Sequence, residues 1–121
     1  TLIPSQMLKG MLEGCILEII RQKETYAYEI SEQLKKYGFG TISEGTIYPI
    51  ILRLMKSELI QATVRESNSG PPRKYYHLTE EGRIALKQFK DHWRELAGAI
   101  NNLLMEGEAI EQSSQRITTE E

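Results

Sequence analysis

The hydrophobic period of this sequence changes at Leu59, and that change limits the folds open to the chain. Within residues 43–59 the apolar side chains recur every three or four positions, which is the spacing of one buried helix face. These side chains are Ile47, Ile50, Ile51 and Leu54. Residues 60–65 then alternate between apolar and polar, as in a strand with one buried side. A turn rich in Ser, Gly and Pro at 67–72 and a return strand at 73–78 complete a predicted hairpin.

Two further helices are expected before this helix and hairpin. The first covers residues 7–22, with Ser5 as its cap and with Leu17 at the margin of its main apolar stripe. Its apolar surface is wider than one stripe, so it needs a second packing partner. The second covers about residues 26–37, and Gly38 is expected to cap it in the left-handed conformation. Two helices joined by a Gly-rich turn and followed by a hairpin predict a winged helix-turn-helix.

The helix within residues 43–59 has two candidate caps, Ser43 and Thr46. A start at Ser43 places Pro49 inside the helix, where it removes one backbone hydrogen bond. A start at Thr46 places Pro49 in the first turn, where no N–H is required, so local chemistry favours Thr46. The exposed face carries hydroxyls early and cations later, which suits either a solvated core helix or a helix that reads DNA.

A long helix is expected to follow the hairpin, from Thr79 to Met105. Its apolar residues are spaced alternately by three and four, as in a coiled-coil seam. They are Leu86, Phe89, Trp93, Leu96, Ile100 and Leu103. About 27 residues span roughly 40 Å, more than a small winged-helix body covers, so a second subunit is expected to bury the distal half. The fold class is therefore mainly α with a small β-hairpin, divided into a DNA-binding domain at 1–78, a dimerisation helix at 79–107 and a flexible polar tail at 108–121.

The net charge of −2 hides an uneven distribution. Residues 1–78 carry ten Lys and Arg against eight Asp and Glu, whereas residues 79–121 carry five against nine. Five cations and two acids fall within residues 53–74, so a local basic patch for nucleic acid is expected. No metal-ligand spacing, Gly-rich phosphate loop or nucleophile motif is present, and neither metal, cofactor nor enzymatic activity is expected. The lone Cys15 and the lack of a membrane or signal segment favour the cytoplasm.

Three stretches resemble the PadR family of transcriptional regulators. Residues 26–30 (Tyr-Ala-Tyr-Glu-Ile) resemble the start of the family's second helix. Residues 45–60, with Gly-Thr-Ile-Tyr-Pro, Arg-Leu and Leu-Ile, resemble its recognition helix, and residues 70–82 resemble its wing tip and the start of its last helix. Ala27 and Glu58 stand where the family often has Gly. The family also starts the recognition helix near Ser43, and the length resembles its smaller subgroup, which has a single C-terminal helix.

The resemblance implies a homodimer that binds an inverted repeat in promoter DNA, represses transcription and is released by an effector. The expected DNA contacts are Tyr26, Ser43, Gly45, Thr46, Tyr48, Arg53, Lys56, Arg65, Arg73 and Lys74. Short members can bind flat aromatic compounds on tryptophans of the last helix, and Trp93 lies at a matching place, with Met7, Met11 and Ala97 as further candidates. The alternative is a winged-helix drug-binding or protein-interaction module with little DNA function.

Overall fold

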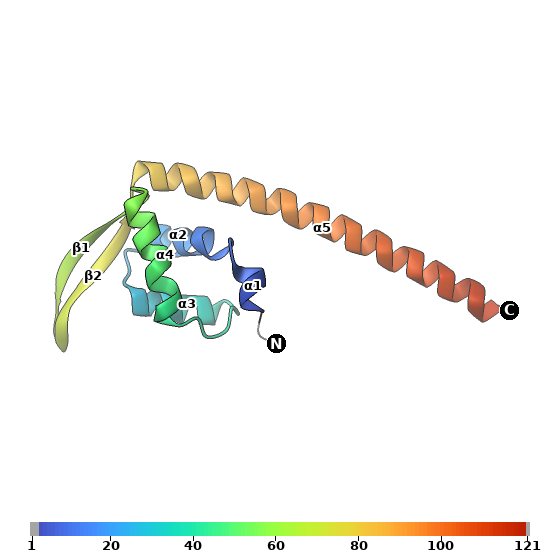
Figure 1. The fold of residues 1–121 in the computed structure, drawn as a ribbon, viewed down its shortest axis with the longest axis horizontal. Coiled ribbons are helices and arrows are strands. Elements are labelled where there is room, and N and C mark those ends of the chain that lie inside the picture. Colours follow the sequence, from blue (N-terminus) through green and yellow to red (C-terminus); the bar gives the residue numbers. More distant parts are fainter. Residues whose placement is uncertain (1–2, 121) are drawn as a thin grey trace. The chain divides into compact units, whose positions relative to one another are not determined.

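The computed structural model describes residues 3–120, with side chains described for residues 3–115 (Figure 1). It consists of α1 (Ser5–Leu8), α2 (Leu12–Gln22), α3 (Ala27–Lys36), α4 (Glu44–Lys56), β1 (Ile60–Ser67), β2 (Gly70–Leu78) and α5 (Glu80–Glu120). The two strands form one antiparallel hairpin between α4 and α5. This is the mainly helical, winged helix-turn-helix architecture expected from the sequence.

The N-terminal helix is interrupted, and the expected single helix over residues 7–22 is wrong. Gly10 has a φ of 90°, which ends α1 and separates it from α2. Glycine adopts this left-handed conformation without a Cβ clash and is a poor helix former, which explains the break. Ser5 is the first helical residue of α1 rather than its cap, because the cap position is taken by Pro4.

The core lies between α2, α3, α4 and the base of the hairpin. The largest fully buried side chains are Ile16, Ile30, Leu34, Ile47, Ile51, Leu54 and Ile60. Leu17 is only 3 % exposed, which corrects its expected place at the margin of the stripe. The reason is that α2 packs against β2 as well as against α3 and α4, so two sides of this helix are covered within the chain.

α4 begins after Ser43, and the preference for a start at Thr46 is wrong. The Thr46 N–H donates to Ser43 Oγ at 3.3 Å, so Ser43 is the cap. The chain before it is fixed by a tertiary contact, because Ser31 Oγ donates to the carbonyl of the buried Ile42 at 2.7 Å. Pro49 therefore lies inside α4, where its missing N–H deprives the Gly45 carbonyl of its helical donor.

α3 and α4 end with the same pattern of hydrogen bonds. After α3, the Gly38 N–H donates to Lys35 O at 3.1 Å and the Phe39 N–H donates to Leu34 O at 3.0 Å. After α4, the corresponding bonds run from Glu58 to Met55 O and from Leu59 to Leu54 O, both at 2.9 Å. Both ends are Schellman motifs, which require a left-handed residue. Gly38 meets that need with a φ of 100°, whereas at the end of α4 the left-handed residue is Glu58, with a φ of 61°.

The hairpin pairs Ile60 with Leu78 at its base and Arg65 with Arg73 near its tip. Thr25 adds a short bridge to the outer edge of β2, in which the Tyr76 N–H donates to Thr25 O at 2.8 Å. Tyr76 and Leu78 are buried, as the alternation predicts. Val64, which the same alternation places on the buried side, is 64 % exposed, because the hairpin extends beyond the core that covers its base.

α5 starts on a tightly packed junction. Thr79 Oγ1 accepts from the Gly82 N–H at 3.0 Å and donates to Glu58 O at 2.7 Å, while the Thr79 N–H donates to Leu59 O at 3.1 Å. A Cβ at position 82 would overlap the Leu59 carbonyl oxygen, so only glycine fits there. These bonds join the start of α5 to the end of α4.

The helix continues much further than expected. α5 reaches Glu120 and so runs through the described part of residues 108–121, where a polar tail is expected, while residue 121 lies outside the described residues. Residues 108–120 contain no proline, and most are compatible with a helix. The chain divides into two compact units after Lys87, inside α5.

Candidate nucleic-acid interface

The first turn of α4 presents small polar groups to solvent. Ser43, Gly45 and Thr46 are all exposed, and Ser43 Oγ lies 3.2 Å from Thr46 Oγ1. A Cβ at Gly45 would meet only Ser43 Oγ, at an ordinary distance of 3.7 Å. The fold therefore does not require glycine here, although glycine weakens a helix. An exposed glycine of this kind lets another molecule approach the backbone closely.

The expected DNA contacts lie on two sides of α4. A groove of about 680 Å³ between the starts of α3, α4 and β2 is lined by Tyr26, Tyr48, Arg73 and Lys74. A second groove, of about 970 Å³, lies between α1, the start of α2 and α4, and is lined by Ser43, Thr46 and Arg53. Gly45, Lys56 and Arg65 do not line either groove. The recognition helix thus separates two concave surfaces.

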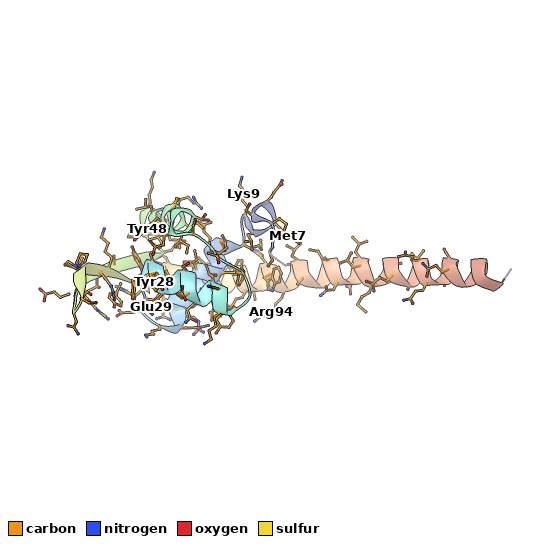
Figure 2. All side chains as sticks on the ribbon, turned by 90° about the horizontal axis from the view of Figure 1, so that it is seen from below. Met7, Lys9, Tyr28, Glu29, Tyr48 and Arg94 are labelled. Atoms are coloured by element: carbon orange, nitrogen blue, oxygen red, sulfur yellow. The ribbon has the colours of Figure 1, made fainter. Side chains whose placement is uncertain are left out.

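Tyr28 is an exposed aromatic residue of the first groove that the sequence reasoning did not name as a contact. It comes from α3, whereas Tyr48 comes from α4 (Figure 2). Leu52 and Glu44 of α4 also line this groove. The spacing of Glu44, Tyr48 and Leu52 at i, i+4 and i+8 places them on one helix side and could have indicated them.

The arginines of the hairpin are held by aromatic rings. Arg65 and Arg73 are direct cross-strand partners, an arrangement in which like charges destabilise a sheet. The Arg65 guanidinium lies 4.7 Å from the Tyr75 ring centroid, and that of Arg73 lies 4.6 Å from the Tyr26 ring. The Tyr26 and Tyr75 rings meet edge to face at 5.3 Å. The rings stabilise both cations without neutralising them, so the positive charge stays available to an anion.

Two of the expected cations have carboxylate partners. Arg65 forms an ion pair with Glu24, in the link between α2 and α3. The distance between Arg53 Nε and Glu13 Oε1 is 3.7 Å. No such pair involves Lys56, Arg73 or Lys74 in the part of the chain that the structure describes.

Burial raises the pKa of two groups in the described part of the winged-helix unit. Burial raises the pKa of the Tyr76 phenol, and the neighbouring Tyr48 raises it further, so Tyr76 stays neutral beneath the groove. Burial also raises the pKa of the Cys15 thiol, which disfavours the nucleophilic thiolate. Neither residue is placed for catalysis.

Among the described residues, 3–120, no group of three or more His, Cys, Asp or Glu residues could hold a metal ion. None of the helices in this range combines the length and apolar character needed to cross a bilayer.

The candidate ligand residues are divided between the two units. Met7 is exposed on α1 (Figure 2), and Met11 precedes α2. Trp93, which is 49 % exposed, and Ala97 lie in α5 beyond Lys87. None of the four lines either groove described above.

The candidate dimer residues also differ in exposure. Leu86 is only 2 % exposed within the single chain, so it belongs to the core and offers little surface to a partner. Phe89 is half-buried, whereas the apolar side chains further along α5 are exposed. These are Trp93, Leu96, Ile100 and Leu103.

The sequence matches a family model over residues 16–88, which include α3, α4 and the hairpin, and that model describes the transcriptional regulator PadR-like family. The chain belongs to this family. Its members are transcriptional regulators rather than enzymes. The exposed first turn of α4 and the cationic hairpin are thus parts of a PadR-like regulator.

Solved structures of transcriptional regulators resemble about four fifths of this chain. A PadR-like transcriptional regulator from Bacillus cereus is 54 % identical, with a TM-score of 0.75, over 82 % of this chain and 96 % of its own. A Streptococcus transcriptional regulator is 43 % identical, with a TM-score of 0.73, over 81 % and 96 %. An uncharacterised protein of Lysinibacillus sphaericus is 34 % identical over 88 % of this chain and 98 % of its own.

Proposed function

We propose that this PadR-like protein is a repressor that binds an inverted-repeat operator as a homodimer and is released by a small aromatic effector. It would act in the cytoplasm, where its DNA target lies. The observation that carries the DNA-binding role is the pair of cations Arg73 and Lys74, which line the first groove and have no carboxylate partner among the described residues. A phosphate backbone could pair with both.

The recognition helix is proposed to enter the major groove with its first turn. Ser43, Thr46 and Tyr48 are exposed there and carry hydroxyls that can bond to base edges or phosphates. The first groove, which Tyr26, Arg73 and Lys74 line, would then lie along one DNA strand. Lys56, Arg53 and Arg65 are proposed to bind the flanking backbone.

The homodimer is supported by α5 beyond Lys87. Its exposed apolar residues repeat at spacings of three and four over residues 93–103. A helix with this pattern is stable when a second helix covers the seam. A two-fold axis would set two recognition helices about one DNA turn, roughly 34 Å, apart.

The effector site is proposed to include Trp93. Its indole is half exposed on the same seam, so a planar aromatic compound could stack on it at the subunit interface. Titration with planar aromatic compounds should quench the fluorescence of Trp93, which is the single tryptophan. Compounds that quench it should also release DNA, and quenching without release would reject this induction mechanism.

The test of DNA binding is fluorescence anisotropy with the DNA upstream of the protein's own gene and with duplexes selected from a random library. Arg73→Ala with Lys74→Ala should weaken binding to all duplexes and lower the slope of log K against log salt by about two for each bound subunit. The matched control is Lys35→Ala with Lys36→Ala, which removes the same charge at the end of α3. Equal binding by both double variants would favour an interaction module with little DNA function.

A further inference from the structure

Two of the five cations proposed to contact DNA already hold an anionic partner inside the chain. Arg65 pairs with Glu24, and Arg53 Nε lies 3.7 Å from Glu13 Oε1. Arg73 stacks on a tyrosine ring instead. The proposed DNA contacts thus include cations of two kinds: Arg65 and Arg53, which have a carboxylate partner, and Arg73, which has none among the described residues.

Both acids come from outside the two helices of the helix-turn-helix motif. Glu13 lies in the first turn of α2, and Glu24 lies in the link that precedes α3. The four paired side chains are 41–60 % exposed, so both pairs are in contact with solvent. Exposed ion pairs add little to folding stability. Stability therefore gives little reason for placing a carboxylate on each of these arginines.

We propose that in the free protein Glu24 and Glu13 occupy the positions beside Arg65 and Arg53 that DNA phosphates take in the complex. DNA binding then exchanges a carboxylate for a phosphate at each arginine. This inference rests on the DNA-binding function proposed above. Carboxylate and phosphate oxygens accept the same charge-assisted hydrogen bonds from a guanidinium. The two acids therefore act as internal competitors of the DNA backbone.

The surroundings of Arg65 are arranged for such an exchange. The stack on Tyr75 keeps its guanidinium at the hairpin surface whichever anion it binds. Glu24 has a second neighbour, because its Oε1 lies 3.7 Å from the Nδ1 atom of His77. That nitrogen is buried and has no hydrogen-bond partner. When Arg65 turns to a phosphate, a small shift of Glu24 would let it accept a hydrogen bond from His77.

The exchange would weaken binding to every duplex by the same factor, since every duplex presents phosphates. A common factor leaves the ratio of operator affinity to arbitrary-DNA affinity unchanged, so base contacts alone set the specificity. The exchange instead lowers the absolute affinity for all DNA. Glu24 and Glu13 are in this sense residues that tune DNA affinity without touching a base.

The experiment measures anisotropy of a fluorescein-labelled duplex of mixed sequence across a salt series. Glu24→Gln should tighten binding about twofold to fivefold for each bound subunit, which is the worth of an exposed ion pair. The matched control is Glu66→Gln, which removes an exposed charge from the same hairpin. Glu24→Gln should tighten binding more than this control, and the excess should vanish in an Arg65→Ala background. Glu13→Gln is tested in the same way against Arg53→Ala.

The outcomes separate this inference from the function on which it rests. A Glu24→Gln protein that binds no more tightly than Glu66→Gln, or more weakly than the wild type, would show that Glu24 does not compete with phosphate. A gain that persists in the Arg65→Ala background would show only a general effect of charge. A wild-type protein that binds no duplex at low salt would overturn both proposals. Far-UV circular dichroism checks that each variant is folded.

Discussion

Glu58 is a residue that the fold holds in an unfavourable conformation. It occupies the left-handed position of a Schellman motif with a φ of 61°, where Gly38 stands in the equivalent motif of α3. The left-handed conformation costs an L-residue about 1–2 kcal/mol, which glycine avoids. Glycine also makes the unfolded chain more flexible, and this offsets about 0.4–1 kcal/mol of the gain in folding stability. Glu58→Gly should therefore raise the free energy of unfolding by about 0.5–1 kcal/mol.

The assay is urea and thermal unfolding of the full chain at one protein concentration, because assembly would make the midpoint depend on concentration. For the winged-helix unit the gain corresponds to a rise in Tm of about 2–8 °C. Glu58→Gln is the control, since it removes the charge near a helix C-terminus but keeps the Cβ.

The same reasoning predicts the opposite effect at Gly38. A Cβ there would meet nothing within 4 Å, so Gly38→Ala should cost about 0.5–1 kcal/mol through backbone conformation alone. If Glu58→Gly is no more stable than Glu58→Gln, the charge rather than the backbone matters, and the argument from φ is refuted.

Three further substitutions follow from the structure. Gly45→Ala should leave stability unchanged or raise it by up to about 1 kcal/mol in urea unfolding, because the space around its Cβ is open, yet weaken DNA binding in anisotropy, because the proposed DNA contact would fill that space. Gly82→Ala should lower the free energy of unfolding by more than about 2 kcal/mol, since its Cβ would overlap the Leu59 carbonyl; a neutral result would mean that the junction is loose. Ser43→Ala should cost about 0.5–2 kcal/mol in the same assay and Thr46→Ala less, because Ser43 is the cap of α4; the reverse order would favour the later start.

The periodic parts of the sequence predicted the core of the fold. The residues Ile47, Ile50, Ile51 and Leu54 are buried as their spacing indicates, because a single helix face decides both the pattern and the packing. The exit of α3 at Gly38 was also predictable, since only glycine adopts its conformation without cost.

Two predictions that failed, the start of α4 and the place of Leu17, depend on contacts between distant residues. The start of α4 is fixed by Ser31 and the carbonyl of Ile42, eleven positions apart, against the local preference set by Pro49. Leu17 is buried because β2, far along the chain, covers a second side of α2. No local pattern contains that information.

The candidate interface divides in the same way. The cations and hydroxyls of α4 and the hairpin could be named from sequence, because their residue types and positions suit phosphate and base contacts. Their partners could not be named: the ion pair of Arg65 joins residues 41 positions apart, and the stack of Arg73 on Tyr26 joins the hairpin to the start of α3. Such pairs follow from the tertiary fold alone.

The junction between α4 and α5 has a mechanical consequence. The last carbonyls of the recognition helix segment, at Glu58 and Leu59, bond directly to Thr79, and Gly82 leaves no space between the two elements. The first turns of α5 and the recognition helix therefore move as one rigid unit. In the proposed dimer, a ligand that rotated this unit would change the distance between the two recognition helices. The residues that contact the bases would stay the same. Such a repressor would dissociate from its operator because its two recognition helices no longer matched the spacing of the half-sites, although each helix could still recognise its bases.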